Sequence, residues 1–337
     1  IMLKRSIKTL KDDSLEIYEK RIAGEIAIGQ LSILLKINDW LESPDNALIA
    51  GELLAETGNP VRAGEIIKKS LENHPTHAES IFLLTRLTVH LTDNNYLPYI
   101  AKKLADLSNR KSISGVEAIR HLTLLHLLNP LSKKSLNTCI ELLQSNPHAK
   151  PIDFMRIYAL QYNISANETE KISIVKLCSE QFDLELGKEI LVFSSWLGRL
   201  GAYQQLLEFL PASRAKVDEE LFKLRMNALA QTNDLDSIHF EVNNAPIIPE
   251  RWRLVIEARA YSLEGNYKES IKVLDRLLPV LGNDPRLVRT ICNYLESSED
   301  ITGLAHILNK LIDQPIHQSF ALRKLMEHRA SSASLEE

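Results

Sequence analysis

A helical pattern that breaks at a regular interval is the feature of this chain that most constrains its fold. The breaks lie 36, 35, 36, 36, 32, 32 and 33 positions apart, at Gly58, Asn94, Asn129, Ser165, Gly201, Asn233, Gly265 and Ser298. A period of about 20 to 50 residues is typical of stacked repeats. Such arrays bury a core between neighbouring repeats and expose a long surface, which favours binding over catalysis.

The length and composition of the chain agree with an array. Its 337 residues exceed the size at which one compact core keeps growing. Apolar residues make up 45% and charged residues 25% of the chain, values that are ordinary for a globular protein and argue against disorder. The formal net charge of −4 provides no overall basic field for a phosphate backbone, so we expect no nucleic-acid partner.

The cysteines indicate a reducing compartment. Cys139, Cys178 and Cys292 lie far apart in apolar helical stretches, without Cys-x-x-Cys pairing or metal-ligand spacing. We expect all three to be free and buried, and the protein to be cytoplasmic.

No stretch predicts a membrane span. The most apolar one, residues 22–37, contains Glu25, Gln30 and Lys36. Because Ile1 precedes Met2, we also consider that the chain is a fragment whose membrane anchor lies upstream.

The clearest repeat unit covers residues 46–75. Its first helical half breaks at Gly58, and Pro60 then suits the first turn of a second helix, where its missing N–H is not needed. Pro75 ends that second helix. The same pattern recurs around Gly265, which Tyr267 follows after one residue. Each unit is therefore predicted to be a helix-turn-helix pair.

These residues resemble the tetratricopeptide repeat family, whose 34-residue unit has small residues, glycine, an aromatic residue and proline at fixed positions. In the first unit the matching residues are Gly51, Leu54, Gly58, Ala63 and Pro75. In the unit that begins near Arg251 they are Ala258, Tyr261, Gly265 and Tyr267, while Ser270 replaces the family's alanine. The resemblance implies an all-α, right-handed superhelical solenoid of stacked helix-turn-helix repeats.

The expected organisation has four parts: capping helices over residues 1–43, a first array over 44–213, a second array over 214–314, and a capping helix with a tail over 315–337. The N-terminal part has an alternative interpretation as a degenerate repeat that turns at Gly24. The second helices after Gly201 and Asn233 are predicted to be short. We expect all prolines, including Pro279, to lie between helices or at their starts.

The sequence contains no motif for catalysis, a cofactor or a phosphate-binding loop. His74 and His77 have a spacing that suits metal chelation, but no further ligand type accompanies them, so we expect an ordinary turn there. We predict a protein that is not an enzyme, with neither cofactor nor metal.

The candidate binding residues are Lys223, Asn227, Arg259 and Arg289, which fall on predicted first helices of three successive units. In tetratricopeptide proteins these helices line a concave groove. The resemblance implies that Lys223, Asn227 and Arg289 match part of the clamp by which some cochaperones hold acidic C-termini. Ile256 and Pro285 stand at its two other positions, which puts chaperone binding in doubt.

The predicted function is a scaffold whose groove binds a protein or peptide, either acidic or bearing a C-terminal carboxylate. Two alternatives stay open. One is the interaction arm of a membrane-anchored envelope or secretion assembly, and the other is a regulatory domain that senses a small ligand. A solvated surface also accounts for the lysine and arginine residues.

Overall fold

The computed structural model describes residues 2–12, 17–36, 39–88 and 96–333, and in these ranges it is all-α, without a β-strand. Contacts divide the chain into unit 1, residues 1–174, and unit 2, residues 175–337. The division falls inside α10 (Glu168–Ser179). The boundary near residue 214 that the sequence favours stays a prediction.

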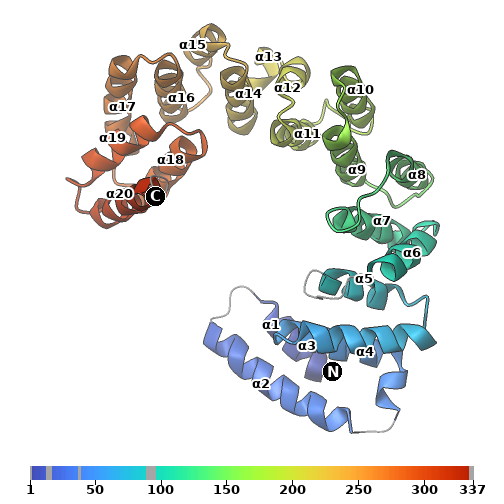
Figure 1. Ribbon diagram of the computed structural model, residues 1–337. Coiled ribbons are helices and arrows are strands. Elements are labelled where there is room, and N and C mark those ends of the chain that lie inside the picture. Colours follow the sequence, from blue (N-terminus) through green and yellow to red (C-terminus); the bar gives the residue numbers. More distant parts are fainter. Residues whose placement is uncertain (1, 13–16, 37–38, 89–95, 334–337) are drawn as a thin grey trace. The chain divides into compact units, whose positions relative to one another are not determined.

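Unit 1 begins with helices that precede the first repeat (Figure 1). α1 (Met2–Leu10) and α2 (Ile17–Leu34) contact each other and α3, and the short 3-10 helix η1 (Trp40–Glu42) follows. The repeat helices are α3 (Pro44–Glu56), α4 (Pro60–Asn73), α5 (Ala78–Leu87), α6 (Tyr96–Ser108), α7 (Ile113–Leu125), α8 (Lys133–Gln144) and α9 (Pro151–Ile164). Since α2 continues through Gly24, the alternative of a repeat that turns there is wrong.

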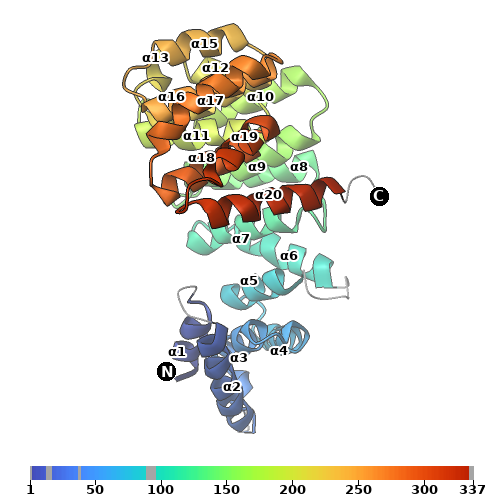
Figure 2. The same cartoon turned by 90° about the vertical axis from the view of Figure 1, so that its left-hand side faces the viewer.

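Unit 2 continues the same arrangement. Its helices are α11 (Gly187–Leu200), α12 (Tyr203–Phe209), α13 (Ala212–Ala215), α14 (Glu219–Gln231), α15 (Leu235–Asn243), α16 (Glu250–Leu263), α17 (Tyr267–Leu281), α18 (Pro285–Ser297), α19 (Ile301–Leu311) and α20 (Gln318–Ala333). The last helix, α20, packs against α19 (Figure 2). Among the described residues, no helix is both long and apolar enough to span a membrane.

Successive first helices of the pairs contact each other within each unit. In unit 1 the row is α3, α5, α7 and α9, and in unit 2 it is α11, α14, α16 and α18. Small residues let a first helix approach its neighbours closely. A Cβ atom on Gly51 of α3 would lie 2.8 Å from Ile67 of α4 and 3.1 Å from Leu83 of α5, the next first helix. The expected stack of helix-turn-helix pairs is therefore confirmed.

The turns inside the pairs lie where the sequence places them, except that Asn94 is outside the described residues. Five turns share one geometry, in which a residue with positive φ is followed by an amide that donates to the carbonyl five positions earlier. These residues are Gly58, Gly201, Asn233, Gly265 and, one position after the expected Ser298, Glu299. This is the Schellman ending of a helix, which favours glycine because a Cβ atom strains the left-handed conformation.

We expect Gly58→Val to lower the free energy of unfolding by about 1 kcal/mol or more. Gly58 has φ of 82°, and a Cβ atom there would meet nothing within 4 Å, so backbone strain is the only cause. Chemical unfolding followed by circular dichroism measures the change. A variant with the unfolding midpoint of the parent chain would contradict the assigned backbone geometry.

The second helices after Gly201 and Asn233 are short, as predicted: α12 has 7 residues and α15 has 9. An ion pair holds this region together. The Arg225 guanidinium donates to both carboxylate oxygens of Glu241, at 2.7 to 3.1 Å, and to the Leu210 carbonyl at 2.8 Å. Both side chains are almost buried, and the pair joins α14 to α15.

Pro279 corrects one expectation, because it lies inside α17 rather than after it. Because proline lacks a backbone N–H, the helix loses one hydrogen bond near its end. Leu277 and Leu281, which are 0% and 2% exposed and four positions apart, hold the last turn on the core. Buried apolar contacts therefore outweigh the helix-breaking tendency of proline here.

The three cysteines are free and buried, as expected. They lie in different helices: Cys139 in α8, Cys178 in α10 and Cys292 in α18. Burial raises the pKa of the Cys139 thiol to about 11 and that of Cys292 to about 12. Neither thiol ionises at neutral pH.

Candidate functional site

The candidate site is the first-helix face of unit 2, which we define as the surface formed by α14, α16 and α18. Lys223 and Asn227 lie one turn apart on α14. The Lys223 ammonium lies 4.1 Å from the ring centroid of Trp252 on α16 and pairs with Glu219 and Glu220. Lys223 is thus held in place, with its side chain 16% exposed.

Arg259 is the residue on this face with the least usual environment. It is 4% exposed, and its Nη1 donates to Asn227 Oδ1 at 3.1 Å. Its Nε is buried without a hydrogen-bond partner, and no carboxylate of the described residues forms an ion pair with it. A buried cation without a counter-ion is unfavourable, because its lost hydration is not replaced.

An arginine at a different position of a first helix in unit 1 shows how a carboxylate satisfies a guanidinium. Arg120 on α7 donates through Nε to Asp153 on the next first helix, α9, at 2.6 Å. The Asp153 side chain is 3% exposed and also accepts the Lys150 amide. The hydrogen bond from Arg120 to Asp153 raises the pKa of the guanidinium above its ordinary value. Unit 1 thus supplies its own carboxylate to its arginine, and unit 2 offers Arg259 only an amide.

Arg289 makes no contact with the other three predicted residues among those that the structure describes. It is exposed on α18, and its guanidinium carbon lies 5.7 Å from the Phe320 ring centroid on α20. Within the described part of the chain, no hydrogen bond, ion pair or ring contact joins it to Lys223, Asn227 or Arg259. The structure therefore brings three of the predicted residues together and places the fourth against α20.

Sequence reasoning missed two aromatic residues of this face. Trp252 stacks edge-on with Tyr294 of α18, with ring centroids 5.4 Å apart, and the Tyr294 hydroxyl is buried without a partner among the described residues. Trp252 lies seven positions before Arg259, which is two helical turns, so helical spacing alone pointed to their common face. The contact with Tyr294 has no such signal, because it depends on how α16 and α18 pack.

The predicted turn histidines have local partners. His74 Nε2 lies 2.8 Å from the Glu42 carbonyl oxygen, and His77 Nδ1 lies 2.8 Å from Ser80 Oγ. In the ranges that the structure describes, no three histidine, cysteine or acidic side chains form a group that could hold a metal ion.

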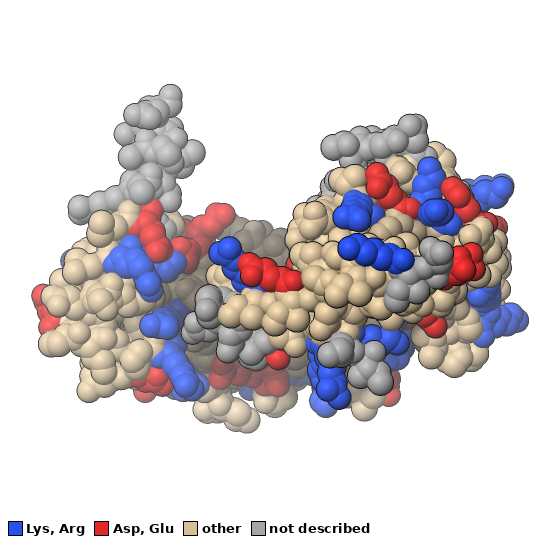
Figure 3. All heavy atoms as spheres, turned by 90° about the horizontal axis from the view of Figure 1, so that it is seen from below, with Lys and Arg blue, Asp and Glu red and all other residues tan. Residues whose placement is uncertain are grey.

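Figure 3 shows basic and acidic side chains interspersed on the face in view, rather than a field of one sign.

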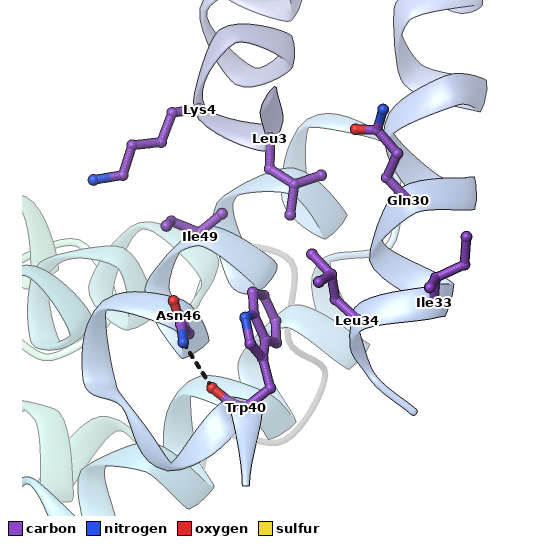
Figure 4. Close-up of a pocket in the computed structure, with 8 residues that line it drawn as sticks. All are labelled: Leu3, Lys4, Gln30, Ile33, Leu34, Trp40, Asn46 and Ile49. Atoms are coloured by element: carbon purple, nitrogen blue, oxygen red, sulfur yellow. Dashed lines mark hydrogen bonds between the residues drawn. The ribbon is translucent and has the colours of Figure 1, made fainter. Parts of the chain in front are cut away.

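A pocket lies in unit 1 among α1, α2, η1 and α3. This pocket of about 540 Å³ has apolar walls that include Leu3, Leu34, Trp40 and Ile49 (Figure 4). Gln30 also lines it, and the Oε1 atom of Gln30 is buried without a donor among the described residues. Its volume falls within the range of small-molecule sites.

Comparison with known proteins finds similarity in structure but not in sequence. No protein-family model and no curated protein matches the chain. The chain is similar to the crystal structure of yeast Tom70, at 13% identity and a TM-score of 0.39, over 96% of this chain and 67% of that one. It is also similar to the APC/C hetero-tetramer Cut9-Hcn1, at 18% identity and a TM-score of 0.30, over 96% and 62% of the two chains.

The arrangement of the helix pairs identifies the repeat architecture of the chain. The described turns at Asn129, Ser165, Gly201, Asn233 and Gly265 follow one another at intervals of 32 to 36 residues, and within each unit the first helices contact one another in succession. The chain is a TPR-like repeat protein. As a TPR-like array it presents first-helix faces on which side chains are fixed by packing, and Lys223, Asn227 and Arg259 are fixed in this way.

Proposed function

We propose that this TPR-like protein is a non-enzymatic scaffold that binds a protein or peptide on the first-helix face of unit 2. The observation that carries the proposal is the buried Arg259, which has no carboxylate partner among the described residues. A guanidinium binds a carboxylate through parallel N–H bonds better than it binds an amide. A partner's carboxylate would supply to Arg259 what Asp153 supplies to Arg120.

The chemistry of the face favours an acidic peptide, or one with a free C-terminal carboxylate. Lys223, although it pairs with Glu219 and Glu220, and the exposed Arg289 are cationic. The half-buried Tyr294 adds aromatic surface, whereas Trp252 is 3% exposed and belongs to the core. Because Lys223 and Arg259 are already held by neighbouring residues, little side-chain entropy is lost when a partner binds. Ile256 is 2% exposed and belongs to the core, so it contributes no contact to a partner.

The test starts from peptides selected out of a random C-terminal library displayed with free carboxylates. We expect the selected peptides to be acidic near their ends and to lose at least about tenfold in affinity as C-terminal amides. We expect Lys223→Gln combined with Arg289→Gln to weaken binding and to reduce its salt dependence. Glutamine is chosen because a glutamate at 223 would add a third carboxylate beside Glu219 and Glu220.

The matched control is Lys216→Gln combined with Arg286→Gln, which removes the same charge from exposed positions of unit 2. It should leave the dissociation constant unchanged, and both double variants should keep the melting temperature of the parent within a few degrees. Equal affinity of the two double variants for the selected peptide would show that the predicted residues are a solvated surface.

The unit 1 pocket favours a second candidate function, the sensing of a small ligand. Its apolar walls and the Gln30 Oε1 atom, which accepts from no donor in the described ranges, fit an apolar molecule that carries one hydrogen-bond donor. A thermal-shift screen with such amphiphiles, repeated on Ile49→Trp to fill the pocket, tests this candidate. The interaction arm of an anchored assembly remains an alternative role for the same scaffold. The three free cysteines support a cytoplasmic location.

A further inference from the structure

The outer side of α2 in unit 1 carries apolar residues that the other described elements leave largely exposed, although Ile33 also borders the unit 1 pocket. Ile22, Ile26 and Ile33 are 42%, 55% and 67% exposed, whereas Ala27 and Leu31 on the other side of the helix are 0% and 2% exposed. Figure 1 shows α2 at the edge of unit 1, with the body of the unit on one side. The end of a repeat array normally presents a polar face, so this apolar one needs an explanation.

The exposed residues have the spacing of a helix-pairing seam. Ile22, Ile26, Gly29 and Ile33 are separated by four, three and four positions, which is the a/d pattern of a coiled coil. They therefore form one stripe along α2, which we call the α2 seam. At Gly29 the α2 seam has a hole, because a Cβ atom built there would meet nothing within 4 Å.

The α2 seam is complementary to itself when it is read in the opposite direction. In an antiparallel pair centred between residues 27 and 28, Ile22 comes opposite Ile33 of the second helix, and Ile26 comes opposite Gly29. Ile26 of each copy thus packs into the hole at Gly29 of the other copy. The two contacts are related by a two-fold axis. A two-fold interface requires this kind of match between a surface and itself.

We propose that two copies of this chain associate through antiparallel pairing of their α2 seams. The occupant of the α2 seam is a second copy, because the match of the large Ile26 with the hole at Gly29 arises from one sequence read in two directions. The inference goes beyond the proposed function and does not depend on it, since it concerns unit 1 and needs no carboxylate partner.

The first experiment measures the mass of the whole chain by light scattering and sedimentation over a concentration series from about 1 to about 100 µM. We expect the mass to rise from 38.2 kDa toward twice that value. Ile26→Lys should weaken association at least about tenfold, by burying a charge in the seam. The matched control, Ile113→Lys, changes an isoleucine that is 65% exposed on α7, and it should leave association unchanged.

The Gly29→Leu variant distinguishes association by shape complementarity from nonspecific hydrophobic association. The new side chain adds apolar surface and meets no atom of its own chain at Cβ, so the fold is kept. It fills the hole into which Ile26 of the other copy packs. We therefore expect the dissociation constant of the dimer to rise at least about tenfold. Tighter association of Gly29→Leu, or a monomer at every concentration, would overturn the proposal.

Cysteine cross-linking tests the register directly, because the three native cysteines are buried. Under mild oxidation, a chain carrying both Ile26→Cys and Gly29→Cys should form covalent dimers much faster than either single variant. A parallel pair predicts the reverse, since each single cysteine would then meet itself. Fast cross-linking of the single variants would therefore contradict the antiparallel arrangement.

Discussion

Replacement of Arg120 by methionine is expected to lower the free energy of unfolding by about 3 kcal/mol, whereas the same replacement of Arg259 is expected to leave it unchanged or raise it by about 1 kcal/mol. Arg120→Met would leave the buried Asp153 without its counter-ion. Arg259→Met removes a buried charge that has no counter-ion among the described residues and fills the same space with apolar atoms. Urea unfolding followed by circular dichroism measures both changes.

The comparison also links stability to function. Arg259→Met should abolish binding of a selected acidic peptide while the protein becomes no less stable, which is the pattern expected of a residue kept for binding. Arg259→Lys serves as the control, because it keeps the charge but loses the parallel N–H bonds, and it should retain part of the affinity. A large loss of stability in Arg259→Met would show that Arg259 is a structural residue.

Gly115→Ala is expected to destabilise unit 1 by about 2 kcal/mol or more. Gly115 lies in the first turn of α7, and a Cβ atom there would overlap the backbone carbonyl oxygen of Arg110. That oxygen cannot easily move away, because it also accepts a hydrogen bond of 3.1 Å from the buried Asn146 side chain. The added methyl group must therefore disturb two inter-repeat turns together.

The control for Gly115→Ala is Gly198→Ala in α11, where the nearest atom to a new Cβ lies 3.8 Å away. That change should be neutral or stabilising by up to about 1 kcal/mol, because alanine favours the helix. The unfolding midpoints in urea give both values. Similar midpoints for the two variants would mean that the α6–α7 turn adapts and that Gly115 is not constrained.

The pairing of helices could be predicted from the sequence because each turn is a local event. Gly58, Gly201 and Gly265 mark left-handed helix endings, and glycine is the residue that accepts this conformation at least cost. The same reasoning fails at Pro279, where the burial of Leu281 extends a helix that local rules would end. Tertiary packing decides such cases, and a single sequence does not display it.

The candidate site was only partly predictable for the same reason. Periodicity places Lys223, Asn227 and Arg259 on neighbouring first helices, and the contact between Asn227 and Arg259 agrees with that placement. Burial of Arg259 depends on how closely α14 and α16 approach. The position of Arg289 against Phe320 depends on α20, which lies outside the repeats. Spacing within the repeats carries no information about either feature.

The burial of the three cysteines makes the chain a reporter of its own local opening. A thiol reagent reacts with the ionised, accessible form, so Cys139, Cys178 and Cys292 become reactive only when α8, α10 or α18 respectively comes loose. Repeat arrays open segment by segment rather than all at once. Labelling rates at the three sites, measured by mass spectrometry on the unchanged sequence, would therefore show which segment of the protein unfolds locally most often.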